Sequence, residues 1–109
     1  INCEQLARSL LFLANRGVQP HSNEIICSRR DAHRVNAILS TSGMYDQSGE
    51  FAFKVGLPAK SGVGGAIVAI VPQFGVITAW SPPLNRYGNS VVAMQVISQL
   101  AEELGLSLF

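Results

Sequence analysis

The sequence predicts an α+β fold in which helices pack on an antiparallel β-hairpin. Residues 65–71 form a continuous apolar run, and residues 76–80 lead back after the turn-forming segment 72–75. Such a pair of segments is typical of two strands that hydrogen-bond to each other. Two helical patterns precede the hairpin and one follows it. Because helices and strands do not alternate one by one, a parallel sheet of βαβ units is excluded.

The first element is predicted to be one helix over residues 3–16. Asn2 can cap its start, and Gly17 can take the left-handed conformation that ends a helix. The apolar side chains of this segment recur at helical spacing: Leu6, Leu10, Leu13 and Ala14, widened by Leu11 and Phe12.

After a polar loop over residues 19–27, Ser28 is predicted to cap a second helix that ends near Gly43, with Asp31 at the third helical position. Residues 45–53 are predicted to form a short helix or a turn. The second helix has an apolar stripe of Ala32, Val35, Ile38 and Leu39.

Pro82 and Pro83 end the second strand, and Asn89 or Ser90 can cap the last helix. The predicted inner face of this helix repeats at three- and four-residue intervals: Ala93, Val96, Ile97, Leu100, Ala101 and Leu104. This spacing is typical of a helix that lies on a sheet.

The composition bounds the possible functions. A chain of 109 residues holds one domain or part of one, and with 14% charged residues it is less charged than most soluble chains. We therefore expect part of its surface to be covered by a partner, and the start at Ile1 suggests a C-terminal piece of a longer protein. A net charge of +1 does not indicate a nucleic-acid footprint, so no nucleic-acid partner is predicted.

The two cysteines, Cys3 and Cys27, have no metal-like spacing and are predicted to be buried free thiols in a reducing compartment. No metal site is expected at His21 or His33, which lack acidic or thiol partners at ligand spacing. The sequence contains no apolar run of membrane-spanning length and no visible signal peptide, so a cytoplasmic location and no membrane partner are predicted.

The triplet Lys60-Ser61-Gly62 lies directly before the apolar strand, in a glycine-rich segment. A lysine, a hydroxyl and bare backbone can face a cleft together, and free amides beside glycines can meet a developing oxyanion. The same context surrounds the Lys-Thr-Gly element of penicillin-recognising enzymes, whose nucleophile comes from Ser-x-x-Lys. No Ser-x-x-Lys occurs here, so the chain is predicted to carry one wall of an active site. The segment does not match the P-loop or dinucleotide-binding patterns, because its glycines precede a strand instead of joining a strand to a helix, so no nucleotide site is predicted.

Several blocks, in order, resemble the C-terminal third of the serine-dependent glutaminases, relatives of the β-lactamase/transpeptidase fold that hydrolyse L-glutamine to L-glutamate and ammonia. The resemblance implies that residues 1–109 are the C-terminal fragment of one glutaminase catalytic domain. The blocks are Ser42-Gly43-Met44-Tyr45-Asp46, Ser48-Gly49-Glu50-Phe51-Ala52, residues 55–65, Trp80-Ser81-Pro82-Pro83-Leu84 and Gly88-Asn89-Ser90.

The resemblance also assigns site residues. Tyr45 matches a tyrosine beside the nucleophilic serine and the bound glutamine, which gives it a catalytic and substrate-binding role. Val63 matches a valine whose amide helps to form the oxyanion hole. Lys60 would supply positive potential, with Ser61 and Gly62 in support.

The implied mechanism is serine attack on the side-chain amide, an acyl-enzyme, release of ammonia and hydrolysis, with no cofactor. The expected partners are L-glutamine, the N-terminal part of the same domain and further copies in a homo-oligomer, and the piece alone is expected to be inactive. Two alternatives stay open. One is a non-catalytic truncated interaction module, and the other is a fragment of a penicillin-binding or β-lactamase-like protein.

Overall fold

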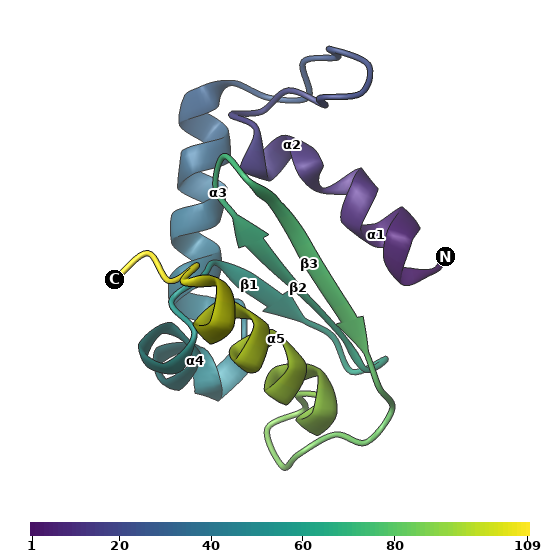
Figure 1. Ribbon diagram of the computed structural model, residues 1–109, viewed down its shortest axis with the longest axis vertical. Coiled ribbons are helices and arrows are strands. Elements are labelled where there is room, and N and C mark those ends of the chain that lie inside the picture. Colours follow the sequence, from purple (N-terminus) through teal and green to yellow (C-terminus); the bar gives the residue numbers. More distant parts are fainter.

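A computed structural model describes all of residues 1–109 and shows a three-stranded antiparallel sheet with helices around it (Figure 1). The strand order is β1-β2-β3, and α5 lies across one face of the sheet. The predicted α+β class and hairpin are confirmed. The elements are α1 (Cys3–Ser9), α2 (Leu11–Ala14), α3 (Arg29–Ser42), a 3-10 helix η1 (Tyr45–Gln47), α4 (Ser48–Lys54), β1 (Ala59–Ser61), β2 (Ala66–Val71), β3 (Gly75–Trp80) and α5 (Val91–Leu104).

Strand β1 was not predicted from the sequence. It pairs with β2 in the register Lys60 to Val68, on the edge opposite β3. Three residues between Pro58 and a glycine-rich turn are too few to display an alternating pattern. The Lys-Ser-Gly triplet therefore begins on an edge strand and continues into the turn that joins β1 to β2.

The predicted single N-terminal helix is wrong in one respect, because the chain breaks at Leu10, where φ is −106° and ψ is 3°. Asn2 does cap α1, in a reciprocal capping box with Gln5. The Ser9 hydroxyl donates to the Leu6 carbonyl oxygen at 2.8 Å, a local bond that competes with helix continuation. The break lets α1 lie along β3 while α2 packs on β2, β3 and α3.

Two apolar clusters hold the sheet between its helices. The predicted buried faces of α3 and α5 are wider than the observed ones. Val35 and Ile38 of α3 and Val96 and Leu104 of α5 are exposed. The larger cluster lies under α5 and includes Met44, Phe51, Leu57, Ile67, Ala69, Ala93, Ile97 and Ala101, and the smaller one under α2 contains Leu13, Ala14, Ala32, Val68 and Ile70.

The predicted burial of the two thiols is also wrong: Cys3 is exposed and Cys27 is half-buried, and both are free. None of the helices combines the length and the apolar character that crossing a membrane requires.

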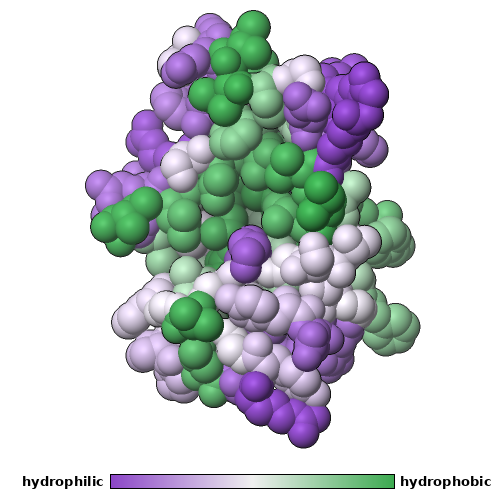
Figure 2. All heavy atoms as spheres, turned by 180° about the vertical axis from the view of Figure 1, so that it is seen from behind, coloured by the Kyte–Doolittle hydropathy of each residue, from purple (hydrophilic) through white to green (hydrophobic).

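On the face of the molecule turned away in Figure 1, apolar side chains gather across the middle between hydrophilic areas (Figure 2).

Candidate active site

The backbone at Tyr45 is held in an uncommon conformation. Its φ of 54° lies in the left-handed region, which costs a residue with a Cβ about 1–2 kcal/mol. Buried Ser48 holds this turn, because its hydroxyl accepts from the Met44 N–H at 3.0 Å and donates to the Tyr45 carbonyl oxygen at 2.8 Å. The ring of Tyr45 is fixed in direction yet remains half exposed.

Lys60 lies against this ring. Its Nζ is 4.7 Å from the centroid of the Tyr45 ring and also donates a hydrogen bond to the Ser61 carbonyl oxygen. An ammonium over an aromatic face is attracted by the negative potential of the ring. The positive charge is therefore held beside the phenol, where it favours negative charge on a reacting group.

A tight turn over residues 62–65 joins β1 to β2. The Gly62 N–H donates to the Ala66 carbonyl oxygen at 3.1 Å, and the Gly65 N–H donates to the Gly62 carbonyl oxygen at 3.0 Å. Between them, the Val63 amide donates to no group of the protein, and the residue is 72% exposed. The turn thus presents a free N–H that can meet a ligand oxygen.

Gly88 brings this turn and Tyr45 together. A Cβ at Gly88 would lie 3.6 Å from Cε2 of Tyr45 and 3.8 Å from Cγ1 of Val63. Its φ of 90° is a conformation that side-chain-bearing residues rarely adopt. Residues predicted for the site from separate blocks are therefore neighbours around one glycine.

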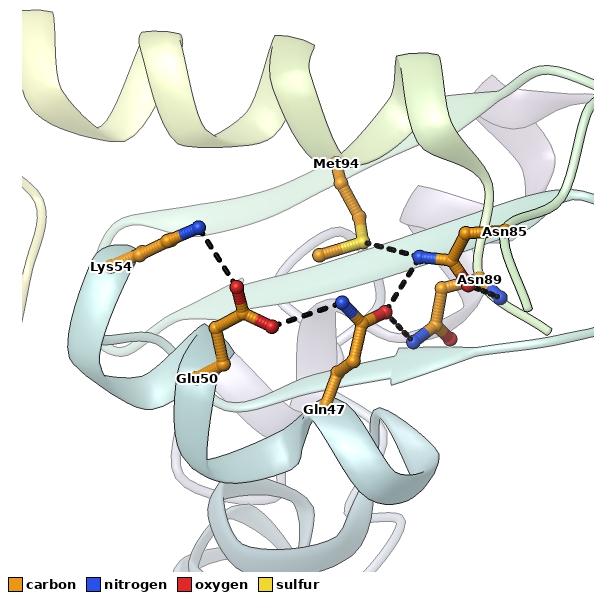
Figure 3. Close-up of polar contacts among 6 residues, drawn as sticks. All are labelled: Gln47, Glu50, Lys54, Asn85, Asn89 and Met94. Carbon is orange, nitrogen blue, oxygen red and sulfur yellow. Dashed lines mark hydrogen bonds and ion pairs between the residues drawn. The ribbon is translucent and has the colours of Figure 1, made fainter. Parts of the chain in front are cut away.

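A buried amide network ties the Tyr45 turn to the loop over residues 81–90 (Figure 3). Asn89, which is fully buried, donates through Nδ2 to the Met44 carbonyl oxygen at 3.0 Å and to Gln47 Oε1 at 2.8 Å. Asn85 Nδ2 donates to the same Gln47 oxygen at 2.7 Å. Two asparagines of one loop thereby hold the segment that carries Tyr45 through hydrogen bonds.

The same asparagines shape the loop that carries Gly88. Asn85 Oδ1 accepts from the Asn89 N–H at 3.1 Å, and the Asn85 carbonyl oxygen accepts from the Gly88 N–H at 3.1 Å. The Asn85 N–H in turn donates to the Asn89 carbonyl oxygen at 2.8 Å. The position of Gly88 between the two site residues follows from this local hydrogen bonding.

Glu50 orients the central glutamine of the network. Gln47 Nε2 donates to Glu50 Oε2 at 3.0 Å, which leaves Gln47 Oε1 to the asparagines, and Lys54 Nζ binds Glu50 Oε1 at 2.8 Å (Figure 3). The hydrogen bond from Lys54, followed by that from Gln47, lowers the pKa of Glu50. A carboxyl with a lowered pKa in the folded state stabilises the fold at neutral pH, and this contribution is lost as the pH falls through the lowered value.

Ser61 faces the other side of the strand. Its side chain is buried and its hydroxyl has no partner, whereas Lys60 beside it is exposed. Successive side chains of a strand point to opposite faces. The three parts of the triplet therefore differ in place: Lys60 lies by Tyr45, Ser61 points into the protein, and Gly62 starts the turn.

The end of α3 is pressed against β1 at Gly43. The Gly43 carbonyl oxygen accepts from the Ser61 N–H at 3.0 Å, and a Cβ at Gly43 would lie 1.7 Å from the Ala59 carbonyl oxygen and 2.7 Å from that of Leu39. Only glycine fits this contact. The glycine thus fixes the edge strand that carries Lys60.

The Gly43→Ala variant is expected to lose about 3 kcal/mol of folding free energy, because its methyl group must displace β1 from the end of α3. Denaturant unfolding of the full-length protein measures this loss. Gly49→Ala is the matched control: nothing lies within 4 Å of a Cβ there, so its stability should stay the same or rise. Equal stability of Gly43→Ala and wild type would contradict the predicted clash.

Sequence reasoning missed the residues that position the site. Gln47 and Asn85 were assigned no role, and Ser48 and Gly88 were noted only as parts of blocks. Beyond its block, Asn89 was considered only as a possible cap of the last helix, a cap that is Ser90 in the structure. Paired asparagines next to turn-forming residues were the available signal, since Asn side chains often organise turns. Their partner, Gln47, lies 38 residues from Asn85 in the sequence and could not be inferred from spacing.

Comparison with known proteins identifies what this arrangement resembles. A family model described as Glutaminase matches residues 1–109. The glutaminase of Pseudomonas entomophila (strain L48) is 51% identical over 100% of this chain and 36% of its own length. Glutaminase 2 of Escherichia coli (strain K12) is 50% identical over 100% of this chain and 35% of its own length. The chain thus spans about a third of the length of these curated relatives.

Solved structures agree with the sequence matches. A probable glutaminase, YbaS, superposes with a TM-score of 0.95 at 38% identity, over 100% of this chain and 35% of that one. The Bacillus subtilis glutaminase YbgJ, in a covalent complex with 5-oxo-L-norleucine formed by reaction with 6-diazo-5-oxo-L-norleucine, has a TM-score of 0.94 at 37% identity, over 100% of this chain and 40% of that one. The expected β-lactamase-like fold class is confirmed.

Proposed function

The chain belongs to the glutaminase family, and we propose that it forms the C-terminal part of a catalytic domain that hydrolyses L-glutamine to L-glutamate and ammonia. Its contribution is one wall of the active site, and the nucleophilic serine lies outside these residues. The observation that carries the proposal is the convergence of Tyr45, Lys60 and Gly88 beside the free amide of Val63.

Each group has a role in amide hydrolysis. The Val63 N–H stabilises the oxyanion of the tetrahedral intermediate, which needs a donor that no protein group already occupies. The Tyr45 phenol moves a proton between the serine and the leaving ammonia. Lys60 adds positive potential beside the Tyr45 phenol and the oxyanion, while Ser61 and Gly62 hold the strand and the turn in place.

Covalent catalysis fits the chemistry of a relative. A covalent complex such as that of the B. subtilis glutaminase forms only when the protein supplies a nucleophile. We expect the full-length protein to react in the same way with 6-diazo-5-oxo-L-norleucine. Its cellular role would be glutamine catabolism in the cytoplasm.

Ammonia release from L-glutamine by the purified full-length protein tests this function. Turnover that 6-diazo-5-oxo-L-norleucine abolishes irreversibly is the expected result. A well-folded protein that releases no ammonia from L-glutamine would overturn the proposal.

The apolar area seen in Figure 2 is proposed to be covered by the rest of the domain or by a second copy. Exposed apolar patches of this kind mark interaction sites. Exposed apolar residues on two helices, Val35 and Ile38 of α3 and Val92 and Val96 of α5, are further candidates for such contacts.

A further inference from the structure

Trp80 is linked to the turn that carries the free amide. Its indole Nε1–H donates to the Gly64 carbonyl oxygen at 2.8 Å, across 16 residues of sequence. Trp80 is the last residue of β3 and is 59% exposed, so its ring is not placed there by burial in the core. The sequence analysis named Trp80 only as part of a block that resembles the glutaminases and gave it no role in the site.

One hydrogen bond spans this turn. The Gly65 N–H donates to the Gly62 carbonyl oxygen at 3.0 Å, and that carbonyl belongs to the same planar peptide unit as the Val63 N–H. The Gly65 N–H in turn shares its peptide unit with the Gly64 carbonyl, which accepts only from Trp80. The indole bond therefore holds the peptide unit whose N–H orients the Val63 amide.

Packing does not replace this bond. A Cβ at Gly62 or at Gly64 would meet nothing within 4 Å. A pocket of about 490 Å³ borders the turn, lined in part by Leu6, Gly64, Ala66 and Trp80. The turn thus has room to move if the indole bond is lost.

We propose that Trp80 is a positioning residue for amide hydrolysis: its indole N–H fixes the Gly64 carbonyl and so aims the Val63 amide at the oxyanion. This inference rests on the proposed function. The effect belongs to the transition state, because the oxyanion forms only there. Loss of the bond should therefore lower kcat and leave KM almost unchanged.

Two substitutions in the full-length enzyme separate the donor from the aromatic ring. Trp80→Phe keeps an aromatic ring but has no N–H, whereas Trp80→Gln loses the ring and keeps an N–H donor at similar reach. We expect Trp80→Phe to lower kcat about 10-fold, near the strength of one neutral hydrogen bond, with KM within about twofold. Trp80→Gln should recover a large part of the loss. Phe74→Leu, at an exposed aromatic residue of the same hairpin, serves as the control with unchanged kinetics.

The outcomes distinguish this inference from the proposed function. Wild-type kcat in Trp80→Phe, or equal loss in Trp80→Gln and Trp80→Phe, overturns the role of Trp80 even if the enzyme is an active glutaminase. Thermal melts must show both variants folded. Trp80→Leu, which also lacks a donor, replaces Trp80→Phe if that variant is unfolded, and Trp80→His, which also keeps an N–H at this reach, replaces Trp80→Gln. A folded Val63→Pro variant that keeps its activity instead removes the oxyanion assignment on which the inference depends.

Discussion

Val63→Pro should abolish glutaminase turnover in the full-length enzyme, because proline has no N–H to donate to the oxyanion. Removing one oxyanion donor typically lowers kcat about 10²- to 10³-fold, which corresponds to roughly 2.7–4 kcal/mol. The Val63 amide has no partner in the protein, so the substitution breaks no existing hydrogen bond. Steady-state ammonia release measures the loss.

Val63→Ala is the matched control. The alanine variant keeps the N–H and removes only a side chain that is 72% exposed, so its kcat should stay near that of wild type. Circular dichroism and thermal melts must first show that the proline variant is folded. If both variants are equally inactive, the side chain rather than the amide matters and the assignment is wrong.

Tyr45→Phe should lower kcat far more than it raises KM. The phenol can transfer a proton and lies beside Lys60 and the Val63 turn, and general acid–base groups contribute about 10²- to 10⁴-fold in rate. The phenylalanine ring retains the contacts with Lys60 and Gly88, so the fold of the turn should not change. Kinetics across substrate concentration separate kcat from KM.

Tyr87→Phe controls for the loss of a tyrosine hydroxyl as such. Its hydroxyl bonds only to the neighbouring Arg86, at 2.6 Å, and its removal should leave turnover unchanged. A Tyr45→Phe enzyme with turnover within a few-fold of wild type would reduce Tyr45 to a packing residue.

The elements with regular patterns were predictable from the sequence. The apolar run of β2 and the spacing of α5 identified a hairpin covered by a helix, and both are present. The pattern overestimated the width of the buried faces, since Val96 and Leu104 keep the helical spacing but contact solvent here. Periodicity identifies a preferred side of a helix and not how much of that side another element covers.

The site was predictable only in part. Tyr45 and Val63 came from the resemblance of blocks, because no spacing rule connects residues 18 positions apart in a turn and a loop. The amide network could not be predicted, since its bonds join Gln47 to asparagines that the fold alone brings near. Strand β1 was too short for a pattern, so the position of Lys60 on a sheet edge was also missing.

At Tyr45, the left-handed backbone sets folding stability against catalytic activity. Glycine or asparagine would adopt the same φ of 54° with less strain, so the fold by itself disfavours tyrosine here. Mutagenesis that selects for heat resistance alone should therefore drift away from tyrosine at this codon, while selection for growth on glutamine restores it. Tyrosine at this position should therefore be retained by activity, against the preference of its backbone.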